Sequence, residues 1–226
     1  MRPRPPASPA ATRRRGARGR PSTTRTRCLR TIPRRSWRPP SGWQRCSSAP
    51  GAPFALAGSV AAFAHGLPAT FQHDTDFCVR PEDAEEAVKA LEGGGIAMRR
   101  APEDWLVKGS SGGEEIDLIF ELARRPVSTA LLQRATVRAV DSVWMPVLSP
   151  TDLMDSRLAA LCEHYCDFGD LLPMARMLRE QIDWDRLDRD HRDSPLADAF
   201  LHLLATLRVI DRTDVNGRPE RKENGP

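Results

Sequence analysis

The chain has 226 residues and a formal net charge of +4, and that small sum hides two segments of opposite charge. Residues 1–50 hold fourteen Arg and no Lys, Asp or Glu, so they carry +14, whereas the remainder carries −10. No run of about eighteen apolar residues occurs and the N-terminus lacks an apolar core of the secretory type, so neither a transmembrane helix nor a membrane partner is expected. Five Cys in a chain of this length do not make a disulfide framework, and the expected location is a reducing cytoplasm.

Residues 1–50 are rich in Arg and Pro and are predicted to be disordered, because they lack the apolar periodicity that would offset the entropy of ordering. Their charge has three interpretations: an arm that attracts nucleic acid electrostatically, an Arg-rich transit peptide, or a stretch of GC-rich DNA read in an unselected frame, in which case the segment is not genuine. The composition leaves all three open. Residues 212–226 are predicted to be a disordered tail.

Residues 51–148 show the mixed pattern of a sheet with interspersed helices. Phe54 to Ala57 reads as a buried strand, and a Gly58-Ser59 turn leads into a short helix closed by Gly66. Further strands are predicted at 75–79, 96–100, 105–108, 115–120 and 136–140, with a turn at 110–113, a short apolar piece at 144–148, and helices that begin near 81 and 128.

Residues 149–211 are predicted to form a small helical unit. A first helix begins at Pro150, and its apolar residues at helical spacing are Leu153, Met154, Leu158, Leu161 and Tyr165. Two more helices are expected near 170–181 and 184–187. The last helix follows a Ser194-Pro195 cap and has the predicted apolar stripe Leu196, Phe200, Leu203 and Leu207. The expected fold class is therefore α/β (α+β), with a mixed sheet followed by a small helical unit.

Three acidic residues lie in the predicted strands or directly beside them. Asp74 and Asp76 are two residues apart, so their side chains leave one face of a strand, roughly 7 Å apart at the backbone. Asp117 alternates with Ile116 and Leu118 and therefore faces away from them. It could join Asp74 and Asp76 from an adjacent strand. Carboxylates that face one another repel unless a cation neutralises them, and oxygen ligands suit Mg²⁺. The alternative to a metal site is that these residues are solvated ends of strands. However, burying a lone carboxylate within an apolar run costs free energy unless the carboxylate has a partner.

The Gly58-Ser59 turn follows a strand and begins a helix. Free backbone N–H groups at such a turn favour a phosphate, glycine permits close approach of the backbone, and the Ser59 hydroxyl adds a donor. A turn with no ligand is the alternative, because strand–Gly–Ser–helix sequences are common.

Together these residues resemble the minimal nucleotidyltransferases of the DNA polymerase β-like superfamily. The shared pattern is an apolar segment followed by Gly-Ser, a spacer, Asp-x-Asp between apolar residues, and a later single Asp in a strand. Here fourteen residues separate Ser59 from Asp74, in the segments LAGSVAAFAHGLP and HDTDFCV. The stretches LSPTDLMDSRLAAL and CDFGDLLPMARML are similar to the part after the sheet in small bacterial members, including the abortive-infection toxin type.

The resemblance implies roles for the residues that match the motif. The Asp pair binds the metals, the later Asp completes the cluster or acts as a base, and the Gly-Ser turn holds the nucleotide phosphates; these are Asp74, Asp76, Asp117, Gly58 and Ser59. The chain departs from the family pattern twice. Arg157 stands where the family usually has a Lys, which keeps the charge but not the geometry, and His73 precedes the Asp pair where a basic residue is frequent.

The implied activity is Mg²⁺-dependent transfer of a nucleoside monophosphate from a nucleoside triphosphate such as ATP to an acceptor hydroxyl. The acceptor is open among a small molecule, a tRNA end, a protein and another nucleotide. The alternative is a catalytically inactive module of the same fold that binds nucleotide or a partner, and the basic arm would add nucleic-acid binding.

Overall fold

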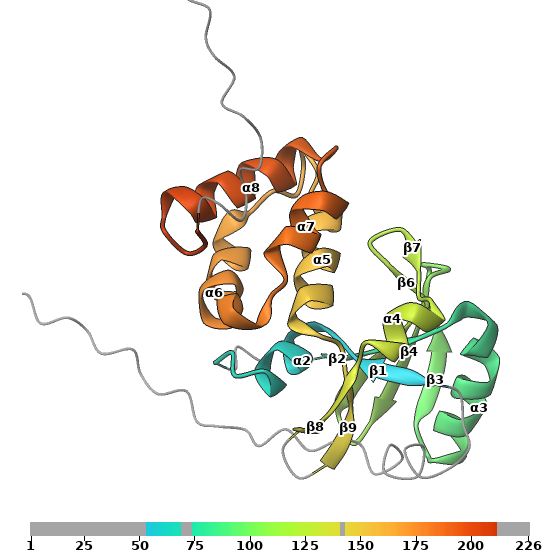
Figure 1. Cartoon of the computed structure of the whole chain (residues 1–226). Helices are drawn as coiled ribbons and strands as arrows, with labels where there is room; N and C mark the ends of the chain where they lie inside the picture. The colour runs from blue at the N-terminus through green and yellow to red at the C-terminus, as the bar shows by residue number, and fades with distance from the viewer. Residues whose placement is uncertain (1–52, 69–73, 141–142, 212–226) are drawn as a thin grey trace, which may run out of the picture. The chain divides into compact units, whose positions relative to one another are not determined.

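The computed structural model describes residues 53–68, 74–140 and 143–211. The predictions for residues 1–50, for His73 and for residues 212–226 therefore lie outside the described residues. Over the described residues, a mixed sheet is followed by a group of helices, which confirms the predicted fold class (Figure 1).

The main sheet has seven strands in the order β3-β4-β5-β2-β1-β9-β8. Their bounds are β1 (Phe54–Leu56), β2 (Asp74–Val79), β3 (Ala97–Arg100), β4 (Leu106–Ser111), β5 (Glu114–Ile119), β8 (Thr136–Val140) and β9 (Val143–Val147). β2 pairs with β5, and β1 with β9, in parallel, whereas the other neighbours are antiparallel. A separate hairpin consists of β6 (Glu121–Leu122) and β7 (Arg125–Pro126).

The central strands β2 and β5 are held by side chains that alternate between two covered faces. Phe77 and Leu118 are opposite each other in the register and are fully buried. Burying a side chain of this size contributes about 1.5–3 kcal/mol. After the short helical turn η1 (Pro81–Asp83), helix α3 (Ala84–Gly93) returns the chain to β3 and buries Leu91. The acidic residues of β2 and β5 therefore lie on strands that buried side chains anchor in the core.

The hairpin between β4 and β5 is tighter than predicted. The turn was expected at 110–113, but β4 continues to Ser111, and only Gly112 and Gly113 lie between the strands. Both glycines have positive φ, 62° and 86°, which is the geometry that a two-residue hairpin requires. The two-residue loop fixes the register between β4 and β5.

Most of the remaining helices begin at side-chain caps. They are α2 (Gly58–Ala64), α4 (Thr129–Gln133), α5 (Pro150–Ala160), α6 (Phe168–Leu178, followed by the turn η2, Arg179–Gln181), α7 (Trp184–Asp190) and α8 (Pro195–Thr206). In five of them a side chain accepts a hydrogen bond from a backbone N–H of the first turn, and these caps are Ser128, Ser149, Asp167, Asp183 and Ser194. Such a cap contributes about 1 kcal/mol.

Two details of the helical part differ from the prediction. Helix α5 ends at Ala160 because Leu161 is extended, so Tyr165 is not on its face but in a turn, where it is 55% exposed. The buried residues of α8 are Ala197, Phe200, Leu201 and Leu204, whereas the expected Leu207 is 40% exposed. Both sets have helical spacing. The spacing predicts that a helix forms, but it does not decide which face of the helix is buried. Packing of α8 against α6, including the contact of Phe168 with Phe200, selects that face.

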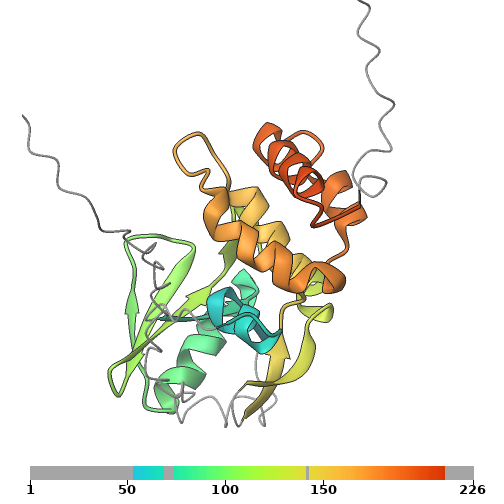
Figure 2. The ribbon, with the colours of Figure 1, turned by 90° about the vertical axis from the view of Figure 1, so that its left-hand side faces the viewer.

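Helix α2 connects the sheet to the helices, since it contacts both β2 and α5 (Figure 2). His65 is the residue directly after α2, and its Nε2 forms a hydrogen bond of 2.8 Å with the carbonyl oxygen of Leu148, just before α5. Gln181 donates a hydrogen bond to the carbonyl oxygen of His65. Burial lowers the pKa of His65, so the ring is neutral at pH 7 and acts as a structural link.

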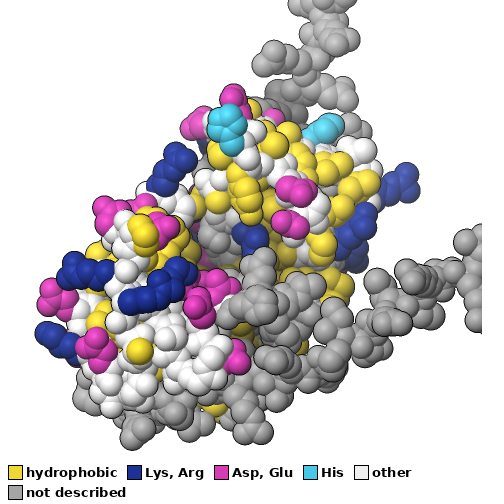
Figure 3. Space-filling model, turned by 180° about the vertical axis from the view of Figure 1, so that it is seen from behind, with side chains coloured by type: hydrophobic (Ala, Val, Ile, Leu, Met, Phe, Trp, Pro, Cys, Tyr) yellow, Lys and Arg dark blue, Asp and Glu magenta, His cyan; other side chains and the backbone are white. Residues whose placement is uncertain are grey.

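On the face that Figure 3 shows, acidic and basic side chains of the described residues are interspersed. The excess of Arg in the sequence lies in residues 1–50, which are outside the described ranges. None of the helices in the described part of the chain combines the length and the apolar character that crossing a bilayer requires.

Candidate functional site

The three predicted acidic residues come together on one face of the sheet. Asp74 and Asp76 lie on β2, and Asp117 lies on β5 directly opposite Asp76 in the parallel register. Residues opposite each other on neighbouring strands point to the same face. One carboxylate oxygen from each of the three lies within 4.8 Å of the others. Within the described ranges, this is the group of acidic, His and Cys side chains that is close enough to share one metal ion.

The Gly58 turn lies against this cluster. The backbone N–H of Ala57 donates a hydrogen bond of 2.8 Å to the carbonyl oxygen of Asp76, which fixes the turn to β2. A Cβ at Gly58 would lie 1.8 Å from Oδ2 of Asp76, and the φ of Gly58 is +63°. Only glycine fits both requirements. Gly58, the first residue of the predicted phosphate turn, therefore borders a carboxylate of the cluster, and Ser59 follows it in the first turn of α2.

The cluster carries more negative charge than its neighbours neutralise. Burial, together with the charges of Asp74 and Asp117, raises the pKa of Asp76 to about 6. Arg157 and Lys108 act in the opposite direction but do not outweigh these effects. Several oxygen ligands with an excess of negative charge form a donor set that fits Mg²⁺.

Arg157 lies in the last turn of α5, where the resemblance to the family places a cation. It is half-buried, and its charge lowers the pKa of Asp76. Arg80, a second arginine near β2, is occupied by other partners. It lies four residues beyond Asp76, just past the end of β2, and its guanidinium donates to Asp83 and to Thr129. Arg157 is therefore the better-placed arginine.

Sequence reasoning missed Lys108. This residue lies on β4 directly opposite Asp117. Its ammonium donates to both oxygens of Asp117, at 2.8 and 2.7 Å. The hydrogen bond to Asp117 raises the pKa of Lys108, so the side chain is charged at pH 7. The two-residue Gly112-Gly113 turn was the available signal, because counting outward from it pairs 108 with 117.

Two further carboxylates, Asp152 and Asp155, hold α5 in place, and their role was not predicted from the sequence. Asp152 accepts from Arg134 at 2.7 Å and from Arg186 at 3.0 Å, and its side chain is fully buried. Asp155 pairs with Arg125 and with Nε2 of His191, each at 2.6 Å.

Arg125 and Arg134 come from β7 and from the end of α4, whereas Arg186 and His191 belong to α7 or its end. Burial alone would raise the pKa of Asp155, but its hydrogen bonds to His191 and Arg125 outweigh burial and lower it. The two carboxylates thus tie α5, which carries Arg157, to residues on both of its sides.

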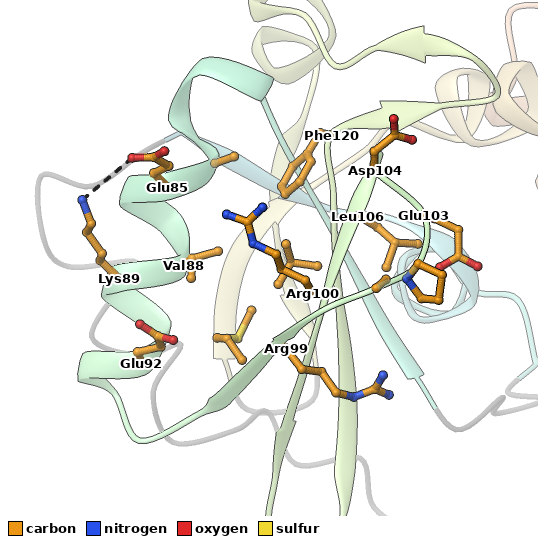
Figure 4. Close-up of a pocket in the computed structure, with 15 residues that line it drawn as sticks. Glu85, Val88, Lys89, Glu92, Arg99, Arg100, Glu103, Asp104, Leu106 and Phe120 are labelled. Carbon is orange, nitrogen blue, oxygen red and sulfur yellow. Dashed lines mark ion pairs between the residues drawn. The ribbon is translucent and has the colours of Figure 1, made fainter.

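A pocket of about 560 Å³ lies between α3 and the strands β3 and β4 (Figure 4). In this view the side chain of Arg100 extends between α3 and Phe120, whereas the side chain of Arg99 points away from α3. Met98 and Val107, which line the pocket, alternate with Arg99 and Lys108 along their strands and so point to the opposite face from Asp117. The pocket is therefore separate from the carboxylate cluster.

No protein-family model and no curated protein matches the sequence. Among solved structures, the solution structure of the antibiotic-resistance factor ANT(2'')-Ia is similar, with 13% identity, coverage of 74% of this chain and 89% of that chain, and a TM-score of 0.47.

The crystal structure of ANT(2'')-Ia in complex with adenylyl-2''-tobramycin has 14% identity, coverage of 73% and 93%, and a TM-score of 0.46. The lincomycin-bound lincosamide antibiotic adenylyltransferase LnuA has 9% identity, coverage of 55% and 84%, and a TM-score of 0.38. Each TM-score lies below 0.5, so the function proposed below rests on the geometry of the chain itself.

Proposed function

We propose that the protein is a Mg²⁺-dependent nucleotidyltransferase that moves a nucleoside monophosphate from a nucleoside triphosphate to an acceptor hydroxyl. The observation that carries the proposal is the convergence of Asp74, Asp76 and Asp117 against the Gly58 turn. Burial and the neighbouring charges of Asp74 and Asp117, which raise the pKa of Asp76, make the ionised cluster costly to the fold, whereas charged groups that only stabilise a fold are paired.

The carboxylates of Asp74, Asp76 and Asp117 would hold one or two Mg²⁺ ions. When bound, Mg²⁺ orients the triphosphate and neutralises the charge that develops on the departing pyrophosphate. Gly58 brings the backbone of the turn close to Asp76 without a side chain in the way, so Gly58 and Ser59 are the proposed contacts for the phosphates. Arg157 adds a positive charge on the side of α5.

Asp117 is the proposed base for the acceptor hydroxyl. It is buried, it faces Asp76 across the strands, and its side chain is rigid because it projects from the middle of a central strand. A base in this role has to lie within hydrogen-bond reach of the hydroxyl. Attack of the acceptor oxygen on the α-phosphorus forms the new ester bond, the bond to pyrophosphate breaks, and the hydroxyl proton passes to Asp117.

The acceptor class is a hydroxyl on a small molecule, a tRNA end or a protein. The finer resemblance, to small toxin-like members, concerns the stretches that became α5 and α6, and these stretches do not identify an acceptor. The proposal is therefore restricted to the transfer reaction and its residues.

The test uses the full chain with each of the four ribonucleoside triphosphates, Mg²⁺, and a mixture of tRNA and small hydroxyl compounds as acceptors. Wild type should release pyrophosphate in a Mg²⁺-dependent manner. Asp76→Asn keeps the shape of the side chain but removes the ligand charge, and pyrophosphate release should fall by at least about a hundredfold.

Asp185→Asn is the matched control, because Asp185 is an exposed residue in the first turn of α7. This control should release pyrophosphate like wild type. Equal release by Asp76→Asn and wild type would rule out the assigned metal site. Nucleotide binding by wild type without any turnover would instead favour the inactive binding module of the same fold.

A further inference from the structure

The contact between Lys108 and Asp117 bears on how the carboxylate cluster takes up metal. The ammonium of Lys108 lies 2.8 and 2.7 Å from the two oxygens of Asp117 and engages the carboxylate symmetrically. Neither oxygen of Asp117 is left without this cationic neighbour. The side chains are 26% and 10% exposed, so water screens the pair less than it would a pair at the surface.

The two strands enforce this contact. Lys108 and Asp117 are opposite each other in the antiparallel register, and the register follows from the glycine hairpin at 112–113. Asp76 lies on the other side of Asp117 in the same sheet. Asp117 therefore lies between the ammonium of Lys108 on β4 and the carboxylates of β2, Asp74 and Asp76.

We infer that the Lys108 ammonium competes with the divalent cation for Asp117, so that metal binding requires the ammonium to give up at least one oxygen of Asp117. The inference rests on the proposed function, because it takes the three carboxylates to be the metal ligands. Lys108 holds Asp117 in place without metal, and it lowers the affinity of the cluster for the ion.

A lysine that only stabilised the sheet would behave differently from a competitor. Removing a structural lysine leaves a buried carboxylate unpaired and loosens the site, so metal affinity would stay the same or fall. Removing a competitor leaves the cluster more negative and the oxygens free, so metal affinity rises. The direction of the change separates the two roles.

The experiment measures Mn²⁺ binding to the full chain without nucleotide, by the loss of the free-ion electron paramagnetic resonance signal. Lys108→Met retains the length of the side chain and removes the charge, and it should bind Mn²⁺ about tenfold more tightly than wild type. Lys108→Gln should change in the same direction, and it replaces Lys108→Met if that variant does not fold. Lys108→Arg keeps the charge and should stay near wild type.

Lys89→Met is the matched control for a lost positive charge, because Lys89 lies on α3 and pairs with the exposed Glu85. It should bind Mn²⁺ like wild type. The chain has only three lysines, at 89, 108 and 222, so their side-chain ammonium signals are readily assigned by nuclear magnetic resonance. Addition of Mg²⁺ should shift the signal of Lys108 and leave that of Lys89 in place.

Two results would overturn the inference, and they have different meanings. If Asp76→Asn abolishes Mn²⁺ binding but Lys108→Met and Lys108→Gln bind no more tightly than wild type, the metal site stands and Lys108 is not a competitor. If wild type and all variants bind no more Mn²⁺ than Asp76→Asn, the proposed metal site itself fails, and the inference fails with it.

Discussion

Two groups of acidic side chains in this protein, each with at least one buried carboxylate, are opposite in charge balance. On β2 and β5, three carboxylates face one another, with Lys108 hydrogen-bonded to one of them and Arg157 nearby. On α5, two carboxylates, Asp152 and Asp155, share four basic partners. The first group is short of positive charge and the second is fully paired.

The pKa directions follow from this difference. The pKa of Asp76 in the first group is raised to about 6, by burial and by its acidic neighbours, whereas the pKa of Asp155 in the second group is lowered by His191 and Arg125. Burying a charge is costly unless it is paired. A paired carboxylate therefore stabilises its surroundings, and a group of carboxylates without enough partners is one that a ligand has to complete.

The largest effect that would sharpen this comparison is expected at Asp152. Asp152→Ala removes a fully buried carboxylate and leaves Arg134 and Arg186 without their partner. The free energy of unfolding should fall by about 3–5 kcal/mol, measured by urea denaturation. The same change at Asp74 in metal-free buffer should leave stability unchanged or higher. If both variants lose the same stability, the distinction between the two groups is wrong.

A somewhat smaller effect of opposite sign is expected at Asp76. The folded protein holds the proton of Asp76 more tightly than the unfolded chain, because its pKa rises from 3.8 to about 6 on folding. Its contribution to stability is therefore present below about pH 4 and is lost as the pH rises through 6. Asp76→Asn should stabilise the metal-free protein at pH 7.5 by up to about 3 kcal/mol, since each pKa unit corresponds to about 1.4 kcal/mol.

The gain from Asp76→Asn should disappear near pH 4, where wild type is protonated as well. Thermal unfolding at the two pH values, with ethylenediaminetetraacetate present, measures the difference between the two proteins. Saturating Mg²⁺ at pH 7.5 should stabilise wild type and leave Asp76→Asn unaffected. A gain that is independent of pH would show that unfavourable burial of the charge is not its cause.

The smallest effect is expected at Gly58. Gly58→Ala places a Cβ at a φ of +63° and against Oδ2 of Asp76. The strain of the backbone costs about 1–2 kcal/mol, and the clash adds to it. In an Asp76→Ala background the clash is relieved, so the cost of Gly58→Ala should shrink to the backbone strain alone. A double-mutant cycle measures this coupling, and additive effects would mean that the turn and the carboxylate do not touch.

The fold and part of the site could be predicted from local patterns. The alternation around Asp117 and the spacing of Asp74 and Asp76 placed these residues on strands, and the structure brings them to one face. Lys108 was missed because a turn of four residues was expected where two glycines suffice, and a lysine beside a turn has no distinctive pattern of its own. Asp152 and Asp155 were missed because acidic residues on a helix are usually exposed.

The order of the elements, the class of the fold and the positions of the acidic residues along the strands were determined by the sequence, because they depend on neighbours a few residues apart. The tertiary structure decided which charges meet. The pairings of Lys108 with Asp117 and of Arg186 with Asp152 join different secondary-structure elements, and whether a buried carboxylate is paired or left for a ligand depends on such contacts.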